Sequence, residues 1–232
     1  MHILVINPNS TTAMTRSIER AALAAAGQGT TITAINPTDT PPAIQGPEDG
    51  AAALPGLFHL FETRMEPSLY DACIIACFDD TGLMTLKRRS PIPLIGIGEA
   101  AFHAAMLVGE RFSVVTTLGV SVPVIEDNLE RYGFASRCAR VRASEIGVLE
   151  LEGARERAGK AIRAEIALAL AEDKPDSIVL GCAGMADLAM NLSDHFHVPV
   201  IDGVAAAVAM AKALRAANAD RWIVAAKERL SA

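Results

Sequence analysis

The sequence predicts an α/β fold made of two similar doubly wound parallel-sheet halves, related by pseudo-twofold symmetry. Three observations lead to this prediction. Short apolar runs alternate with longer helical patterns, most runs are continuous in Val, Ile and Leu, and the order of the first half recurs in the second. Continuous apolar runs are typical of parallel strands covered on both faces. Strand–helix alternation indicates βαβ units.

The expected elements follow one another in order along the chain. Eight strands are expected in two sets of four: His2–Asn7, Thr31–Ile35, Ala72–Cys77 and Pro93–Ile97, then Phe112–Thr117, Ala139–Ala143, Ser177–Cys182 and Val198–Asp202. Between them lie helical patterns at Thr11–Ala26, Gly50–Met65, Glu99–Gly109, Pro123–Tyr132, Glu152–Ala171 and Ala205–Ala217. The segment Asn36–Gly50, with four prolines and two glycines, predicts an ordered loop at the carboxyl edge of the first sheet.

The two sets of four strands resemble each other in sequence. Cys77 precedes Pro93 by 16 residues, and Cys182 precedes Pro199 by 17. We therefore expect residues 1–97 to form one α/β half and residues 98–203 the other. The last segment, 204–232, is expected to return to the first half, because its apolar face needs a partner. Chance similarity between ordinary βαβ units is the alternative.

Composition limits the partners that we expect. The chain has 232 residues, 51% of them hydrophobic, and a formal net charge of −6. No stripe of Lys and Arg is present to neutralise phosphates, which argues against nucleic acid. We see no signal peptide and no apolar run of the roughly 18 residues that span a bilayer. A cytoplasmic protein with no membrane partner and a small-molecule substrate is expected.

The four cysteines do not form a disulfide or metal pattern. No Cys-x-x-Cys motif occurs, and the "HFH" at His195–His197 is better explained as a helix end than as a metal site. Two of the cysteines, Cys77 and Cys182, stand where a buried strand ends and a helix is expected to begin. Helix N-termini lower the pKa of a thiol, so we expect both to be reactive. Cys73 and Cys138 show no such placement.

Two thiols at equivalent positions suit one chemistry in particular. The pseudo-symmetry would direct both at one cleft between the halves. A racemase removes a proton from one face of a carbon and returns one to the other face, and a thiolate with an opposing thiol can do this in both directions. The N–H groups at the two strand–helix turns could stabilise the developing enolate.

Three motifs carry a resemblance to a known family. "INPNST" at the start, "ACFDDTGL" in the middle and "LGCAGMADL" late in the chain resemble the aspartate/glutamate/hydantoin racemase family, and the hydantoin and allantoin branch most. The resemblance implies two similar α/β domains and a cofactor-independent mechanism with catalytic Cys77 and Cys182. It also implies that ligand contacts lie at Asn9, Ile44, Phe78, Thr116, Thr117, Gly181 and Ala183.

Some positions leave questions open. Thr81 stands where members of this family often carry proline. Asp79 and Asp80 follow Cys77, where a carboxylate would oppose thiolate formation unless it points away, and we interpret one of them as a helix N-cap. Anchoring of its own loop is as good an interpretation of Ile44 as contact with a substrate.

The substrate follows only in part. The site segments carry no Arg or Lys, which favours a neutral ring, a 5-substituted hydantoin or allantoin, over a free amino acid. The alternatives are an aspartate/glutamate-type racemase and a non-catalytic two-lobed binding protein. No dinucleotide fingerprint or Schiff-base lysine is apparent, so no metal and no cofactor is expected. A homo-oligomer is expected, but its size, the ring substituent and the pathway do not follow from the sequence.

Overall fold

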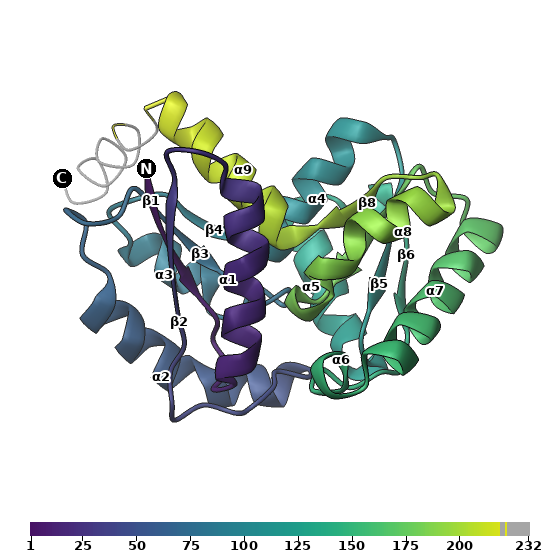
Figure 1. The fold of residues 1–232 in the computed structure, drawn as a ribbon, viewed down its shortest axis with the longest axis horizontal. Coiled ribbons are helices and arrows are strands. Elements are labelled where there is room, and N and C mark those ends of the chain that lie inside the picture. Colours follow the sequence, from purple (N-terminus) through teal and green to yellow (C-terminus); the bar gives the residue numbers. More distant parts are fainter. Residues whose placement is uncertain (219–220, 222–232) are drawn as a thin grey trace.

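In the part of the chain that the structure describes, eight strands form two separate four-stranded sheets in which every pair of neighbours is parallel (Figure 1). The computed structural model describes residues 1–218 and 221. The first sheet has the order β2-β1-β3-β4 and the second the order β6-β5-β7-β8, so the two orders are equivalent. The strands are β1 (His2–Ile6), β2 (Thr31–Ile35), β3 (Ala72–Ile75), β4 (Leu94–Gly96), β5 (Phe112–Thr116), β6 (Cys138–Ala143), β7 (Ser177–Gly181) and β8 (Val200–Asp202).

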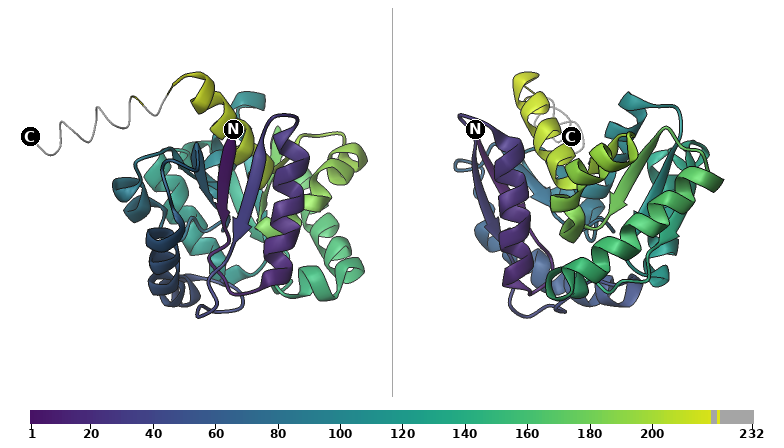
Figure 2. Two further views of the ribbon diagram at one scale, coloured as in Figure 1. Left: turned by 60° about the vertical axis from the view of Figure 1, so that its left-hand side comes forward. Right: turned by 45° about the vertical axis from the view of Figure 1, so that its right-hand side comes forward.

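Helices connect the strands and cover both faces of each sheet (Figures 1 and 2). The α-helices are α1 (Thr12–Ala26), α2 (Pro47–Arg64), α3 (Leu83–Arg89), α4 (Ile97–Val108), α5 (Val122–Tyr132), α6 (Glu150–Gly153), α7 (Arg155–Glu172), α8 (Ala189–Phe196) and α9 (Gly203–Ala216). Three 3-10 helices accompany them: η1 (Gly119–Ser121), η2 (Ala135–Arg137) and η3 (Ala183–Leu188).

One large apolar core joins the two sheets. It contains buried residues of both, such as Val5 of β1 and Val114 of β5, together with residues of α1, α4 and α9. The outer face of the first sheet packs against α2 and α3 around Leu57 and Leu86. The outer face of the second sheet packs against α7 and α8 around Ile162. The inner helices are therefore shared by the two sheets.

The predicted fold class is confirmed, and so are all eight strands. The helices after the two key cysteines differ from the prediction. Cys77 is followed by a turn, and α3 begins only at Leu83, while Cys182 is followed by η3 rather than by an α-helix. The expected loop at Asn36–Gly50 ends earlier, because α2 begins at Pro47, a residue favoured in the first helical turn.

The division at residue 97 stays a prediction. The described part of the last segment is α9, which packs against α1 of the first half and against α4 (Figure 1). Residues 219–220 and 222–232 of this segment lie outside the described residues.

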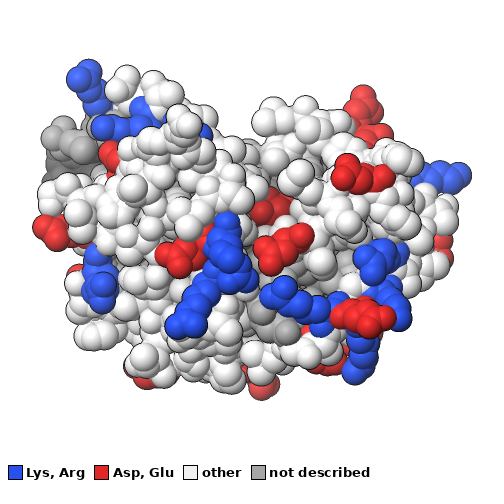
Figure 3. Space-filling view, in the orientation of Figure 1, with Lys and Arg blue, Asp and Glu red and all other residues white. Residues whose placement is uncertain are grey.

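No described helix is long and apolar enough to cross a membrane. On the face drawn in Figure 3, positive and negative side chains are interspersed rather than gathered into one basic area.

Candidate active site

The candidate site lies at the carboxyl ends of the central strands of both sheets. In the first sheet, β1 leads into Asn9 and β3 leads into Cys77. In the second, β5 leads into Thr117 and β7 leads directly into Cys182. Ligands of open α/β sheets bind beyond the carboxyl ends of the strands, where neighbouring connections diverge. The equivalent strand orders place the two cysteines at equivalent positions.

A single cavity is lined by both cysteines. Eight of the nine predicted site residues line it: Asn9, Ile44, Cys77, Phe78, Thr117, Gly181, Cys182 and Ala183. The remaining lining residues are Met14, Ala76, Asp79, Ser121 and Val148. The geometry that the sequence predicted, two thiols facing one space between the halves, is therefore present.

Thr116 is the predicted site residue that the structure places elsewhere. Its side chain is buried in the second sheet, where the hydroxyl donates to the carbonyl oxygen of Gly181 at 2.9 Å. A Cβ atom on Gly181 would come within 2.7 Å of the Thr116 Cβ, so glycine permits the close approach of β5 and β7 at the cavity wall. Thr116 supports the strand that ends in Cys182 and does not itself line the cavity.

Two loops from different halves meet over the cavity. Ile44, in the loop before α2, is buried and lines the cavity, as does Val148 in the segment after β6. The Val148 backbone N–H donates to Gln45 Oε1 at 2.9 Å, which joins the two loops. Ile44 therefore fulfils both interpretations, since it lines the cavity and belongs to an anchored loop. Sequence reasoning missed Val148, Met14 and Ser121, which lie in unremarkable helical or loop sequence.

The side chain of Asn9 is held by its own loop. Its Oδ1 accepts hydrogen bonds from Asn7 Nδ2 at 2.9 Å and from the Thr11 backbone N–H at 3.0 Å. Its amide nitrogen donates to Met14 Sδ at 3.6 Å. Sulfur is a weak acceptor, so this amide is a donor that a ligand carbonyl could use.

Each catalytic candidate receives a hydrogen bond from the backbone two residues further on. The Asp79 N–H donates to the Cys77 thiol, and the Gly184 N–H donates to the Cys182 thiol. The Thr81 hydroxyl also donates to Cys77 Sγ at 3.5 Å. All three contacts favour thiolate, and proline at position 81 could not make the third. The two halves thus repeat the same arrangement around sulfur.

The expectation of lowered thiol pKa values was nevertheless wrong. Burial raises the pKa of Cys182 to about 12, and it raises the pKa of Cys77 further still. The nearby Asp79 carboxylate adds to both increases, and each N–H contact opposes them. The sequence showed the donors at the strand ends but not how far the rest of the chain buries the two thiols, and this burial is the larger effect.

The two aspartates have separate roles. Asp80 accepts hydrogen bonds from the backbone N–H groups of Gly98 at 3.1 Å and Glu99 at 2.8 Å, and from the Tyr132 hydroxyl at 3.0 Å. It caps α4, a helix distant in sequence, rather than the helix that follows it. Asp79 faces the cavity, and burial raises its pKa to about 7. One aspartate is thus an N-cap, as interpreted, but of an unexpected helix.

Similarity to known proteins agrees with this geometry. The model of a family described as Asp/Glu/Hydantoin racemase matches residues 3–211. The chain belongs to this family. Racemases are isomerases, and the expectation that the protein is an enzyme of that class is confirmed.

Relatives within this racemase family are similar over nearly the whole chain. A hydantoin racemase of Rhizobium meliloti is 48% identical over 219 residues, which cover 94% of this chain and 90% of the relative. The structure of an allantoin racemase from Klebsiella pneumoniae has a TM-score of 0.90 and 41% identity, covering 94% of this chain and 89% of that one. An allantoin racemase structure from Pseudomonas fluorescens also has a TM-score of 0.90, with 39% identity and coverage of 94% and 92%.

Proposed function

We propose that the protein racemises a hydantoin-type ring, a 5-substituted hydantoin or allantoin, by proton transfer between Cys77 and Cys182 without a cofactor. The observation that supports this most is the single cavity lined by both thiols, which stand at equivalent strand ends of the two halves. The names of the relatives, hydantoin racemase and allantoin racemase, point to the same class of ring.

The reaction needs one thiolate and one thiol. The thiolate removes the proton from ring carbon C5, and the electron pair of the broken C–H bond delocalises onto the neighbouring C4 carbonyl. The opposing thiol then donates its proton to the other face of C5. The first cysteine ends as a thiol and the second as a thiolate, so the same steps run in reverse for the other enantiomer.

The developing negative charge on the carbonyl oxygen needs a donor placed in advance. The Asn9 amide nitrogen lines the cavity and contacts only the weak acceptor Met14 Sδ among the hydrogen-bond partners of the described residues. A fixed donor in a site from which water is excluded stabilises such charge more strongly than water does. Asn9 is therefore the residue that we assign to the ring carbonyl.

The lining of the cavity favours a neutral ring over a free amino acid. Among the described residues that line it, none has a positively charged side chain, and Asp79 is acidic. The second carboxylate of aspartate or glutamate would need a positive partner in such a place, because an unpaired buried charge is strongly disfavoured.

Solvent-deuterium exchange tests the proposal. Cys77→Ser and Cys182→Ser should each abolish net racemisation, because one face of C5 then lacks its acid or base. Each variant should still exchange the C5 proton of one pure enantiomer, followed by NMR in heavy water, and the two variants should prefer opposite enantiomers. Cys138→Ser is the matched control, since Cys138 begins β6 and does not line the cavity, and it should racemise at the wild-type rate.

Two results would contradict the mechanism. Racemisation by either Ser variant at near the wild-type rate would remove the need for two bases. Exchange of the same enantiomer by both variants would mean that the thiols do not lie on opposite faces of C5. Cofactor independence is tested separately: activity should survive exhaustive dialysis against a chelator, and its return only on addition of metal or pyridoxal phosphate would refute it.

A further inference from the structure

Asp79 has a hydrogen-bonding capacity that the racemase mechanism does not use. It lines the cavity together with both cysteines. One carboxylate oxygen, Oδ2, is buried and has no hydrogen-bond partner among the described residues. Buried carboxylate oxygens are almost always paired, since an unpaired one loses its hydration without compensation. An acceptor left unpaired in a cavity wall is therefore a candidate for a ligand's donor.

The Asp79 side chain is fixed from the other side by the loop before α2. The Gly46 backbone N–H donates to the carboxylate. Gly46 has a φ of 94°, and a Cβ atom there would come within 2.8 Å of Val120 Cγ2, so this turn requires glycine. Because the turn is fixed, one face of the carboxylate is satisfied and the orientation of the other is set.

We propose that Asp79 is a specificity-determining residue that accepts a hydrogen bond from a ring N–H of the substrate, and thereby selects cyclic ureides over rings alkylated at that nitrogen. This inference rests on the proposed function. The ring has carbonyl groups, for which Asn9 offers a donor, and N–H groups, for which Asp79 offers an acceptor. The cavity thus presents complementary polar groups on residues that follow β1 and β3.

Electrostatics gives a reason for selecting a donor at this position. A carboxylate near two thiols opposes thiolate formation, and Asp79 raises the pKa of both cysteines. A ligand N–H that binds the carboxylate would delocalise part of this charge. A bound substrate would therefore reduce the negative charge of Asp79, which opposes ionisation of the thiol that removes the substrate's proton. An N-alkylated ring cannot do this, and its alkyl group would meet the carboxylate.

Binding of a ring that cannot react tests the inference. 5,5-Dimethylhydantoin has no proton at C5, and its 1-methyl and 3-methyl derivatives each lack one ring N–H. We expect the wild-type protein to bind the parent about tenfold to a hundredfold more tightly than one of the two derivatives, by calorimetry, as for a hydrogen bond to a charged group. This ratio should fall to about threefold or less in Asp79→Asn and Asp79→Ala.

The two variants act differently. In Asp79→Asn the amide oxygen can keep the Gly46 contact. The NH2 donor then faces the ring N–H, which weakens binding of the parent ring. In Asp79→Ala the space left by the carboxylate can accept the methyl group, which strengthens binding of the N-methyl derivative. Asp127→Asn, at an exposed carboxylate of α5, is the matched control and should keep the wild-type ratio.

The wild-type protein alone provides an independent measurement. Its affinity for the parent should fall as the pH is lowered from 8 to 5, because protonation of Asp79 around pH 7 removes the acceptor. The affinity for the discriminated derivative should change much less. The thiols of Cys77 and Cys182 stay protonated in this range, and any effect of Asp80, whose pKa burial also raises to about 7, is common to both ligands.

Failure of the Asp79 assignment can be distinguished from failure of the proposed function. A protein that racemises hydantoins while both Asp79 variants keep the wild-type ratio would overturn the assignment of Asp79 and leave the proposed function intact. Equal affinity of the wild-type protein for all three rings would overturn it as well. A wild-type protein that neither binds 5,5-dimethylhydantoin nor racemises any hydantoin would refute the proposed function, and this inference with it.

Discussion

Replacing Asp80, in the turn after β3, should destabilise the protein, because its carboxylate is buried and hydrogen-bonded to two helices. Asp80 is 6% exposed, and its carboxylate joins the turn after β3 to α4 and α5 through three hydrogen bonds. Asp80→Ala removes the cap of α4, a loss of about 1 kcal/mol. It also leaves the Tyr132 hydroxyl without its acceptor, a further loss of about 1–3 kcal/mol. Together the free energy of unfolding should fall by about 2–4 kcal/mol.

Urea denaturation, with the midpoint and slope fitted together, measures this loss. Tyr132→Phe is the matched control, because it removes one donor and leaves the two backbone contacts, so it should lower the free energy of unfolding by only about 1 kcal/mol. In the double variant the two losses should not add, since the groups share a hydrogen bond. An Asp80→Ala protein within about 0.5 kcal/mol of the wild type would refute the reasoning, because surface substitutions already span that range.

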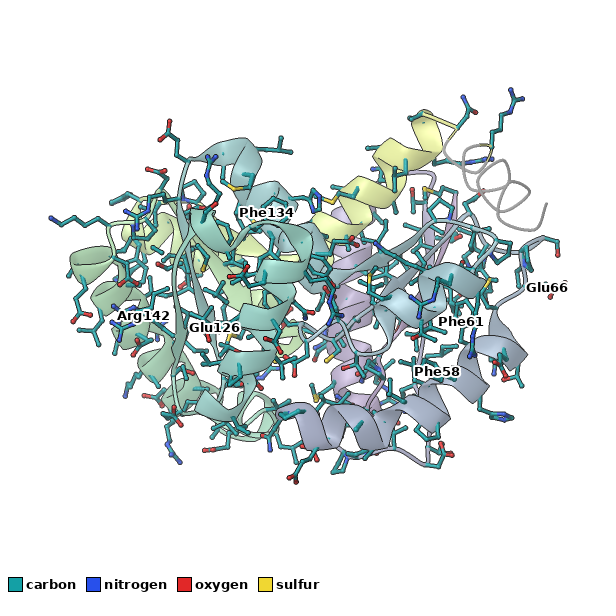
Figure 4. All side chains as sticks on the ribbon, turned by 180° about the vertical axis from the view of Figure 1, so that it is seen from behind. Phe58, Phe61, Glu66, Glu126, Phe134 and Arg142 are labelled. Carbon is teal, nitrogen blue, oxygen red and sulfur yellow. The ribbon has the colours of Figure 1, made fainter. Side chains whose placement is uncertain are left out.

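Three further predictions concern buried ionisable groups. The alkylation rate of Cys182 by iodoacetamide should rise about tenfold per pH unit up to pH 10, since burial raises its pKa to about 12, and a plateau below pH 9 would contradict this. Arg142→Met should lower the free energy of unfolding, measured in urea, by about 3–5 kcal/mol, because it leaves the carboxylate partners of a buried guanidinium unpaired. Its rate of racemisation should be unchanged, because Arg142 lies in the second half, away from the first (Figure 4). Burial raises the pKa of Asp79 to about 7, so Asp79 contributes stability below about pH 4 that is lost as the pH rises to 7. Burial raises the pKa of Asp80 to about 7 as well, so the free energy of unfolding of Asp79→Asn should still decline over this range, but less than that of the wild type, and an equal decline would contradict this.

The sequence predicted the strands well because their signal is local. Continuous runs such as Phe112–Thr116 are apolar on both sides, as parallel strands covered by helices must be. The predicted helical patterns did not include α3 or α8, since helices of seven and eight residues offer too few turns for a periodic pattern. The equivalence of the two halves was predictable through the internal repeat, which aligns Cys77 with Cys182, but the order of the strands within each sheet was not predicted.

The parts of the site that escaped prediction depend on contacts distant in sequence. Asp80 looks like the cap of the helix after it, but its carboxylate reaches Gly98 and Tyr132. The pKa values of the two thiols are raised rather than lowered, because burial in a cavity lined by both halves outweighs the nearby donors. Local sequence shows which donors surround a thiol. It does not show how much water the rest of the chain removes.

The raised thiol pKa values are compatible with the proposed reaction because the two cysteines are not independent. Ionisation of Cys182 raises the pKa of Cys77, since two negative sulfurs would share one buried cavity. When one thiol ionises, the other is therefore held protonated, which is the pairing of base and acid that a racemase needs at each turnover. Burial makes the thiolate scarce, but it also makes it a stronger base toward a weak carbon acid. The same burial that opposes ionisation thus keeps the second proton in place to be delivered to the opposite face.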